Sequence, residues 1–215
     1  MNGICCIVGA GDNSGTELFI PKGAYVIAAD GGLETLRKAG ITPDLIIGDF
    51  DSLQSPLPEG NVIRLPVEKD DTDTMAAVRR ALALGCNNII IYGGLGGRLD
   101  HSLANLQLLL YISRNGAKAF LVGDGVVCTA VTNGGLRLAK RDRGTVSVFS
   151  ADSAAEGVAI EGLKYTLNEY TMSNFLPLGV SNEFIGREAL IKVGQGSLLI
   201  ICQDGCFSPD NYKFV

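Results

Sequence analysis

The stretch YVIAADGGLETLRKAGITPDLIIGDFDS, residues 25–52, places one helical pattern between two apolar runs. The runs Tyr25–Ala29 and Leu45–Ile47 contain no polar alternation, as expected of strands that are buried on both faces. Leucines recur at helical spacing between these runs, and Gly40 then marks the end of the helix. A strand, a helix and a second strand in this order predict a parallel sheet covered by helices.

The same alternation extends from the start of the chain to about Asp124. Two further helical patterns end before Gly85 and before Asn115. Further apolar runs predict strands at 4–8, 62–65, 88–92 and 118–122. The first part of the chain is therefore expected to be an α/β domain, residues 1–124.

Beyond Asp124 the pattern changes to β-rich runs separated by turns. These runs lie at 128–132, 136–140, 145–149, 157–161, 189–193 and 197–202. Turn spacing by itself fits either an antiparallel sandwich or a barrel. We expect a second, all-β domain at residues 125–215.

Composition excludes several classes of protein. With 215 residues and 47% hydrophobic residues, the chain is long and apolar enough to bury a core. A net charge of −5 without a basic block argues against a nucleic-acid surface. The start of the chain has no basic leader, and no apolar run approaches the roughly 20 residues that span a bilayer. We expect a cytoplasmic protein that binds neither membrane nor nucleic acid.

The six cysteines and the single histidine show no zinc-binding spacing. We expect most of the cysteines to be small buried residues in a reducing compartment.

Four polar clusters each follow an apolar run. They are ADGG (29–32), GDFDS (48–52), EKDDTD (68–73) and GGLGGRLDH (93–101). Ligands of open α/β sheets bind outside the carboxyl ends of the strands, so these clusters are expected to converge. Carboxylates beside glycines and helix starts are suited to a magnesium-bound polyphosphate, because Mg²⁺ prefers oxygen ligands. The clusters therefore indicate a nucleotide-using transferase.

In GDFDS, Asp49 and Asp51 are two residues apart. In an extended segment both carboxylates face the same side while Phe50 points into the protein, an arrangement that suits a metal. A turn stabilised by side-chain hydrogen bonds explains the pair equally well.

In EKDDTD, three carboxylates stand beside Lys69 just ahead of a helix that is expected to begin near Thr74. Asp71 or Thr72 could simply cap this helix. One cap does not explain three carboxylates, whose mutual repulsion is comparable to the roughly 0.3–1 kcal/mol returned by the helix dipole. A bound cation would relieve that repulsion.

In GGLGGRLDH, glycines precede a leucine-rich helix, so that backbone amides can approach a phosphate at the helix amino terminus. The segment is neither a P-loop nor a dinucleotide fingerprint. Arg98 is a candidate to clamp a phosphate through paired hydrogen bonds. His101 could transfer a proton, or it could cap or pack the helix.

These four clusters, in this order and spacing, resemble the thiamin pyrophosphokinase family. The likeness continues into EGLKYTL (Glu161–Leu167) and GVSNE (Gly179–Glu183), so it covers nearly the whole chain. The resemblance implies an α/β nucleotide domain followed by a β-sandwich, and a homodimer with active sites between subunits. It also implies transfer of pyrophosphate from ATP to thiamin with Mg²⁺.

The resemblance assigns roles by matching position. In the first domain, Asp100 would lie close to the reacting centre, as a general base or as a group that orients the hydroxyl. The magnesium ligands would be Asp49, Asp51 and Asp73. The ATP-binding residues would be Asp30, Gly31, Gly32, Lys69, Thr72 and Arg98.

In the second domain, the resemblance implies that Ser181 and Asn182 bind thiamin. Some family members stack an aromatic residue, often tryptophan, on the thiamin ring. This chain has no tryptophan, so Phe or Tyr is the candidate substitute.

Two other functions compete with this one. The first is the same transfer onto another hydroxyalkyl heterocycle, such as a hydroxymethylpterin. The motifs of the first domain are expected to bind the nucleotide and the metal, and they do not specify the substrate that accepts the pyrophosphoryl group. The second is a noncatalytic nucleotide sensor that kept the fold.

Overall fold

The computed structural model describes residues 3–13, 15–50, 60–68, 70–203 and 207–215. The chain divides into two compact units, Met1–Leu108 with Leu121–Asp124, and Leu109–Phe120 with Gly125–Val215. The predicted boundary after residue 124 stays a prediction. The stretch Leu109–Phe120, which was expected in the first domain, makes its contacts with the second unit.

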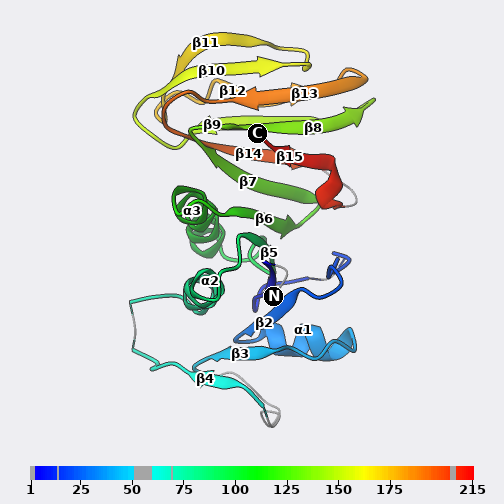
Figure 1. The fold of residues 1–215 in the computed structure, drawn as a ribbon, viewed down its shortest axis with the longest axis vertical. Helices are drawn as coiled ribbons and strands as arrows, with labels where there is room; N and C mark the ends of the chain where they lie inside the picture. Colours follow the sequence, from blue (N-terminus) through cyan, green and yellow to red (C-terminus); the bar gives the residue numbers. More distant parts are fainter. Residues whose placement is uncertain (1–2, 14, 51–59, 69, 204–206) are drawn as a thin grey trace. The chain divides into compact units, whose positions relative to one another are not determined.

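The first unit is built on a parallel sheet in the strand order β5-β1-β2-β3-β4 (Figure 1). The bounds are β1 Ile4–Val8, β2 Tyr25–Ala29, β3 Leu45–Gly48, β4 Val62–Arg64 and β5 Asn88–Tyr92. Each of β1, β2, β3 and β5 has at least four buried residues, because helices shield the faces of the sheet. Strand β6 (Lys118–Gly123) is shared between the two units.

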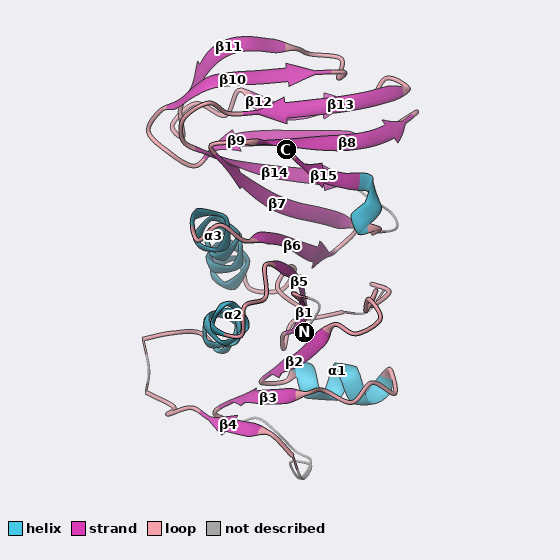
Figure 2. Ribbon diagram, in the orientation of Figure 1, coloured by secondary structure: helices cyan, strands magenta, loops and turns pink. Residues whose placement is uncertain are grey.

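Helices α1 (Gly32–Lys38) and α2 (Asp73–Ala83) pack on this sheet. They lie on opposite sides of it (Figure 2). Right-handed crossovers require this arrangement, since β2–α1–β3 and β4–α2–β5 move in opposite directions along the sheet. Helix α3 (Leu99–Arg114) follows β5 and begins in the first unit. The sequence-based prediction of an α/β fold is thereby confirmed.

The second unit contains two antiparallel sheets, in the strand orders β12-β9-β14-β7 and β11-β10-β13-β8-β15. Alternate residues of β8, β9, β10 and β14 are buried, which is the pattern of strands that cover a core with one face. The bounds are β7 Val126–Thr132, β8 Gly135–Arg141, β9 Thr145–Ser150, β10 Ala155–Glu161, β11 Leu167–Met172, β12 Gly179–Glu183, β13 Arg187–Lys192, β14 Ser197–Gln203 and β15 Tyr212–Phe214. This confirms the predicted β-sandwich part of the fold class.

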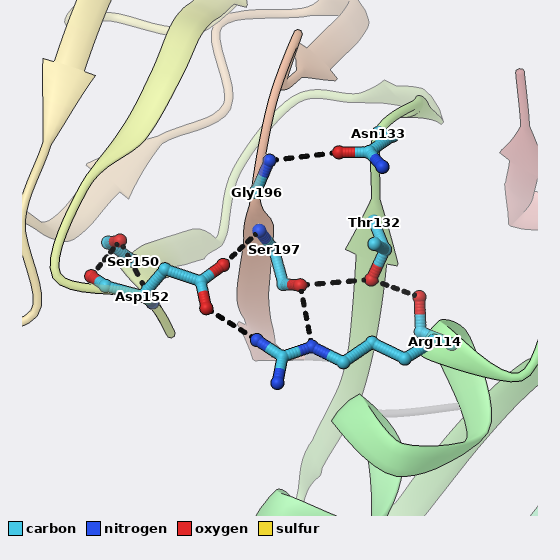
Figure 3. A network of polar contacts seen from close by, with 8 residues as sticks. Arg114, Thr132, Asn133, Ser150, Asp152, Gly196 and Ser197 are labelled. Atoms are coloured by element: carbon cyan, nitrogen blue, oxygen red, sulfur yellow. Dashed lines mark hydrogen bonds and ion pairs between the residues drawn. The ribbon is translucent and has the colours of Figure 1, made fainter.

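A polar network within the second unit joins the last turn of α3 to strands β7 and β14 (Figure 3). Arg114 forms an ion pair with Asp152 and donates a hydrogen bond from Nε to Ser197 Oγ at 3.2 Å. The Asp152 carboxylate also accepts from the Ser197 backbone N–H at 2.7 Å. Ser113 Oγ donates to Thr132 Oγ1 at 2.9 Å.

Within the described ranges, no helix has the length and apolar character needed to cross a membrane. The five described cysteines are buried and form no disulfide with one another.

Candidate functional site

A pocket of about 380 Å³ opens in the first unit. Its walls come from the carboxyl ends of β1, β2 and β5 and from the amino-terminal turns of α2 and α3. The lining residues are Ala10, Gly11, Asp12, Ala29, Asp30, Thr72, Asp73, Thr74, Gly93, Gly94, Gly96, Gly97, Arg98, His101 and Asn105. Three of the four polar clusters therefore converge, as the rule for open α/β sheets predicts.

Helix α2 brings Thr72 and Asp73 to the pocket. Thr72 is the N-cap, and its Oγ1 accepts a hydrogen bond from the Met75 N–H at 3.1 Å. Of the two capping residues that the sequence allowed, Thr72 is therefore the cap. Asp71 instead forms an ion pair with Arg79, with 3.2 Å between Asp71 Oδ2 and Arg79 Nε. Asp73 is the first helical residue and lies in the first turn, where the helix dipole favours a negative charge.

Arg98 and Asp100 form a two-point ion pair at the start of α3. Arg98 Nε lies 3.1 Å from Asp100 Oδ1, and Arg98 Nη2 lies 2.6 Å from Asp100 Oδ2. The hydrogen bond from Arg98 lowers the pKa of Asp100, and the same bond raises the pKa of Arg98. Arg98 and His101 line the pocket, while Asp100 does not. The geometry thus pairs Asp100 with Arg98, and Asp100 itself is not part of the pocket wall.

Asp30 lies in the turn between β2 and α1 and lines the pocket. Its φ of 49° falls in the left-handed region, which is uncommon outside glycine. The Asp30 N–H donates to Ile47 O at 2.8 Å, and the Asp30 carbonyl accepts from the Leu33 N–H. Strain of this kind is a marker of functional sites when the surroundings hold it in place.

The two glycines after Asp30 are not among the pocket-lining residues. A Cβ on Gly32 would stand 1.8 Å from Val8 O, so glycine is required for α1 to start against β1. Gly31 is the N-cap of α1 and lies beside Ala10. These contacts explain both glycines through packing.

Asp49 ends the run of β3 and is not among the pocket-lining residues. Its neighbour Phe50 is buried, with the Arg64 guanidinium 5.7 Å from the ring centroid. The φ of Phe50 is 63°, in the left-handed region, so the backbone is not extended there as the alternating pattern required. The predicted site residues Asp51 and Lys69 lie outside the described residues. Among the residues that are described, no three His, Cys, Asp or Glu side chains gather as a metal site.

In the second unit, Ser181 and Asn182 lie on β12 at a register shift against β9. Ser181 has a φ of 56°, and its N–H donates to Ser147 Oγ at 3.0 Å. The Asn182 amide is largely occupied by main-chain groups. Its Oδ1 accepts from the Tyr165 N–H, and its Nδ2 donates to Tyr165 O at 2.6 Å. The Tyr165 side chain is 60% exposed.

The sequence reasoning missed three polar residues of the pocket. Asp12 follows β1, so the rule that singled out the other strand ends would have found it. Thr74 follows Asp73 in the first turn of α2. Asn105 lies four residues after His101 on α3, and this helical spacing was its only local signal.

Comparison with known proteins covers both units. Residues 16–121 match the family model described as "Thiamin pyrophosphokinase, catalytic domain". Residues 136–198 match the model "Thiamin pyrophosphokinase, vitamin B1 binding domain". Thiamine pyrophosphokinase of Bacillus subtilis is 30% identical over 184 residues, which cover 81% of this chain and 85% of that protein.

Solved structures give the same result. The crystal structure of the Bacillus subtilis thiamine pyrophosphokinase superposes with a TM-score of 0.85 at 27% identity, covering 94% of this chain and 99% of that one. The enzyme from Geobacillus thermodenitrificans gives 0.82 at 28% identity, covering 94% and 97%. The likeness therefore extends over both units in sequence and in fold, and the chain belongs to the thiamin pyrophosphokinase family.

Proposed function

We propose that the pocket of the first unit binds ATP and that the chain transfers its pyrophosphoryl group to the hydroxyl of thiamin, giving thiamin diphosphate and AMP. The chain is an ATP-dependent diphosphotransferase of the thiamin pyrophosphokinase family. The observation that carries the assignment is the meeting, in one pocket, of Arg98, two helix starts and the carboxylates of Asp30 and Asp73. Neither a hydroxymethylpterin acceptor nor a noncatalytic sensor is favoured by the relatives.

The phosphates fit the part of the pocket formed by α2 and α3. Unpaired N–H groups and the dipole at a helix amino terminus attract anions. Arg98 adds a charged side chain that can form paired hydrogen bonds to phosphate oxygens. Thr72, and Lys69 by family resemblance, complete the proposed phosphate contacts.

By family resemblance we propose Asp49, Asp51 and Asp73 as the residues that would hold Mg²⁺; of these, Asp73 lines the pocket. The support is the chemistry of the donors: carboxylate oxygens are the ligands that Mg²⁺ prefers, and Asp73 and Asp30 bring them to the pocket. When bound, the ion would offset the negative charge that develops on the phosphates. Without it, the pocket carboxylates of Asp30 and Asp73 would repel the polyphosphate.

The reaction is an in-line displacement. The thiamin hydroxyl oxygen attacks the β-phosphorus, the bond from that phosphorus to the α–β bridging oxygen breaks, and the hydroxyl proton is released. The protein mainly positions the groups and offsets charge in such transfers. Asp100 contributes by holding Arg98, and its lowered pKa keeps it ionised in this pair.

Thiamin binding is proposed for the segment around β12. Ser181 is exposed there in a strained conformation, and Asn182 holds the main chain of Tyr165 beside it. We propose Tyr165 as the aromatic residue that stacks on thiamin in place of tryptophan. The Tyr165→Ala variant should raise KM for thiamin by about 2- to 13-fold, which corresponds to the roughly 0.5–1.5 kcal/mol of one aromatic contact, while Tyr165→Phe stays close to wild type. An unchanged KM in Tyr165→Ala would contradict this role.

A homodimer is proposed as well. Phe175, Leu176 and Leu178, between β11 and β12, are 82%, 54% and 47% exposed, and such apolar groups are typical of surfaces that a partner covers. Light scattering measures the mass directly, and a monomer at micromolar concentration would exclude the dimer.

The test of the function is an incubation of the purified protein with ATP, Mg²⁺ and thiamin, followed by detection of AMP and thiamin diphosphate. A hydroxymethylpterin in place of thiamin tests the other acceptor, and AMP release with neither acceptor measures background hydrolysis. Magnesium-dependent ATP binding without AMP release would indicate the sensor instead.

The Asp73→Asn variant should lower turnover by at least about 10²-fold, the loss typical of one electrostatic stabiliser. Asp71→Asn is the matched control, because Asp71 pairs with Arg79 and does not line the pocket. Near-normal turnover in Asp73→Asn would contradict its place in the metal site.

A further inference from the structure

Asn105 stands out among the pocket residues because it is polar and only 8% exposed. It lies on α3, one turn beyond His101, and is followed closely by the buried Leu108 and Leu109 of the same helix. A buried amide needs hydrogen-bond partners, because an unsatisfied one costs about 1–3 kcal/mol. The partners of its amide nitrogen and oxygen therefore indicate what role the residue has.

One end of the amide is held by the protein. Asn105 Nδ2 donates to Gly94 O at 2.9 Å. A Cβ on Gly94 would lie 3.0 Å from Nδ2 and 2.6 Å from Leu121 Cδ1, so a glycine at this position leaves room for the contact. Because a carbonyl can only accept, the nitrogen must face Gly94, and this fixes the oxygen on the other side of the amide.

The Asn105 oxygen is available to a ligand. None of the described residues donates a hydrogen bond to Oδ1, and Oδ1 is not one of the side-chain oxygens that are sealed from solvent. Since the residue lines the pocket, the exposed part of Oδ1 belongs to the pocket wall. Asn105 Oδ1 is therefore a fixed acceptor in the pocket wall, and it can accept a hydrogen bond from a ligand.

We propose that Asn105 is a specificity-determining contact for the nucleotide, with Oδ1 accepting a hydrogen bond from a donor on the nucleoside. The inference rests on the proposed function, in which this pocket takes ATP. Ionised phosphates offer only acceptors, so they are repelled by Oδ1 and drawn to Arg98 and the helix starts. The donors that ATP offers are the ribose hydroxyls and the exocyclic amine of adenine, and Oδ1 takes one of them.

The first experiment uses the wild-type protein and titration calorimetry without thiamin, in excess Mg²⁺. ATP is compared with 2′-deoxy-ATP, 3′-deoxy-ATP and inosine triphosphate, which lack one donor each. One analogue should bind about 5- to 100-fold more weakly, the fold-change that corresponds to one unmade hydrogen bond to a buried acceptor. A loss with a deoxy analogue identifies the hydroxyl, and a loss with the inosine nucleotide identifies the amine. Equal binding of all four within twofold overturns the inference.

The second experiment repeats the titrations with Asn105→Ala. The difference in affinity between ATP and the more weakly bound analogue should disappear, because the variant lacks the oxygen that accepts the hydrogen bond. Asn115→Ala is the matched control: Asn115 Nδ2 also donates to a main-chain carbonyl, that of Tyr111, but does not line the pocket, so the difference should persist. A difference that persists in Asn105→Ala overturns the inference.

The same titrations separate this inference from the proposed function. ATP affinity that is unchanged in both Arg98→Ala and Asp73→Asn would show that ATP does not use this pocket, which would overturn the function and this inference together. If ATP affinity falls in those variants but all four nucleotides bind the wild-type protein equally, the role of Asn105 alone is overturned.

Discussion

Asp100 and Arg98 are two exposed side chains that shift each other's pKa and so favour the charged form of both. Their two hydrogen bonds hold the guanidinium in one orientation, and the carboxylate is stabilised in its ionised form. A lowered pKa means that Asp100 loses its charge only when the pH falls below the usual range of a carboxyl group. Near neutral pH both members of this pair are therefore charged.

We predict that Arg98→Gln raises the pKa of Asp100 toward its ordinary value, because the donor that lowers it is removed. The carboxyl carbon of Asp100, followed by NMR as the pH is lowered, should titrate at higher pH in the variant. Arg37→Gln, which alters a pair with Glu34 outside the pocket, serves as the control and should leave this titration unchanged. Identical Asp100 titrations in Arg98→Gln and wild type would contradict the prediction.

At the scale of elements, one side chain of β5 holds the long connection between β1 and β2 through two hydrogen bonds. Tyr92 is fully buried, and its hydroxyl accepts from the Phe19 N–H and donates to Phe19 O, both at 3.0 Å. Burial also raises the pKa of Tyr92, so the hydroxyl stays neutral and able to donate. The start of this connection lines the pocket through Ala10, Gly11 and Asp12, so its anchoring concerns the site.

We predict that Tyr92→Phe lowers the free energy of unfolding by about 1–3 kcal/mol, because two hydrogen bonds in a buried setting are lost with little change of shape. Denaturant unfolding measures the difference. Tyr111→Phe removes a more exposed hydroxyl on α3 and should change stability by about 0.5 kcal/mol or less. Equal stability of the two variants would show that the anchor contributes nothing.

At the scale of the whole molecule, each unit has its own core, and α3 contributes residues to both units. Within the second unit, the end of α3 is held by Arg114 and Asp152 and by the hydroxyls of Thr132 and Ser197 (Figure 3). The Asp152 carboxylate is the central acceptor of this network. Its loss should loosen the helix end from the strands.

We predict that Asp152→Asn lowers the stability of the second unit by about 1–3 kcal/mol, since a charged acceptor of two hydrogen bonds is replaced by a neutral amide. Calorimetric unfolding records the shift. In a cycle with Arg114→Ala, the two changes should be less than additive, because the residues share one contact. Full additivity would show that the ion pair is not coupled.

The sequence by itself determined the fold class and the location of the pocket. Apolar runs and helical spacing are properties of neighbouring residues, so β1 to β5 and α2 could be found without the structure. Asp30, which follows β2, and Asp73, which starts α2, then meet in one pocket because parallel strands bring their carboxyl ends and the helices that follow to one edge. The predictions omitted β11, β12 and the three-residue strand β15. Most residues of β11 and β12 are exposed and give no apolar run.

Only the tertiary structure decided how the polar groups are used. That Asp100 holds Arg98, that Asn182 holds Tyr165, and that Asn105 turns its oxygen to the pocket depend on which atoms meet. Side-chain hydrogen bonds join residues such as Tyr165 and Asn182, which are 17 positions apart in the chain. Periodicity along a sequence reports which face a residue takes, while the partner on that face is set by the packing of distant segments.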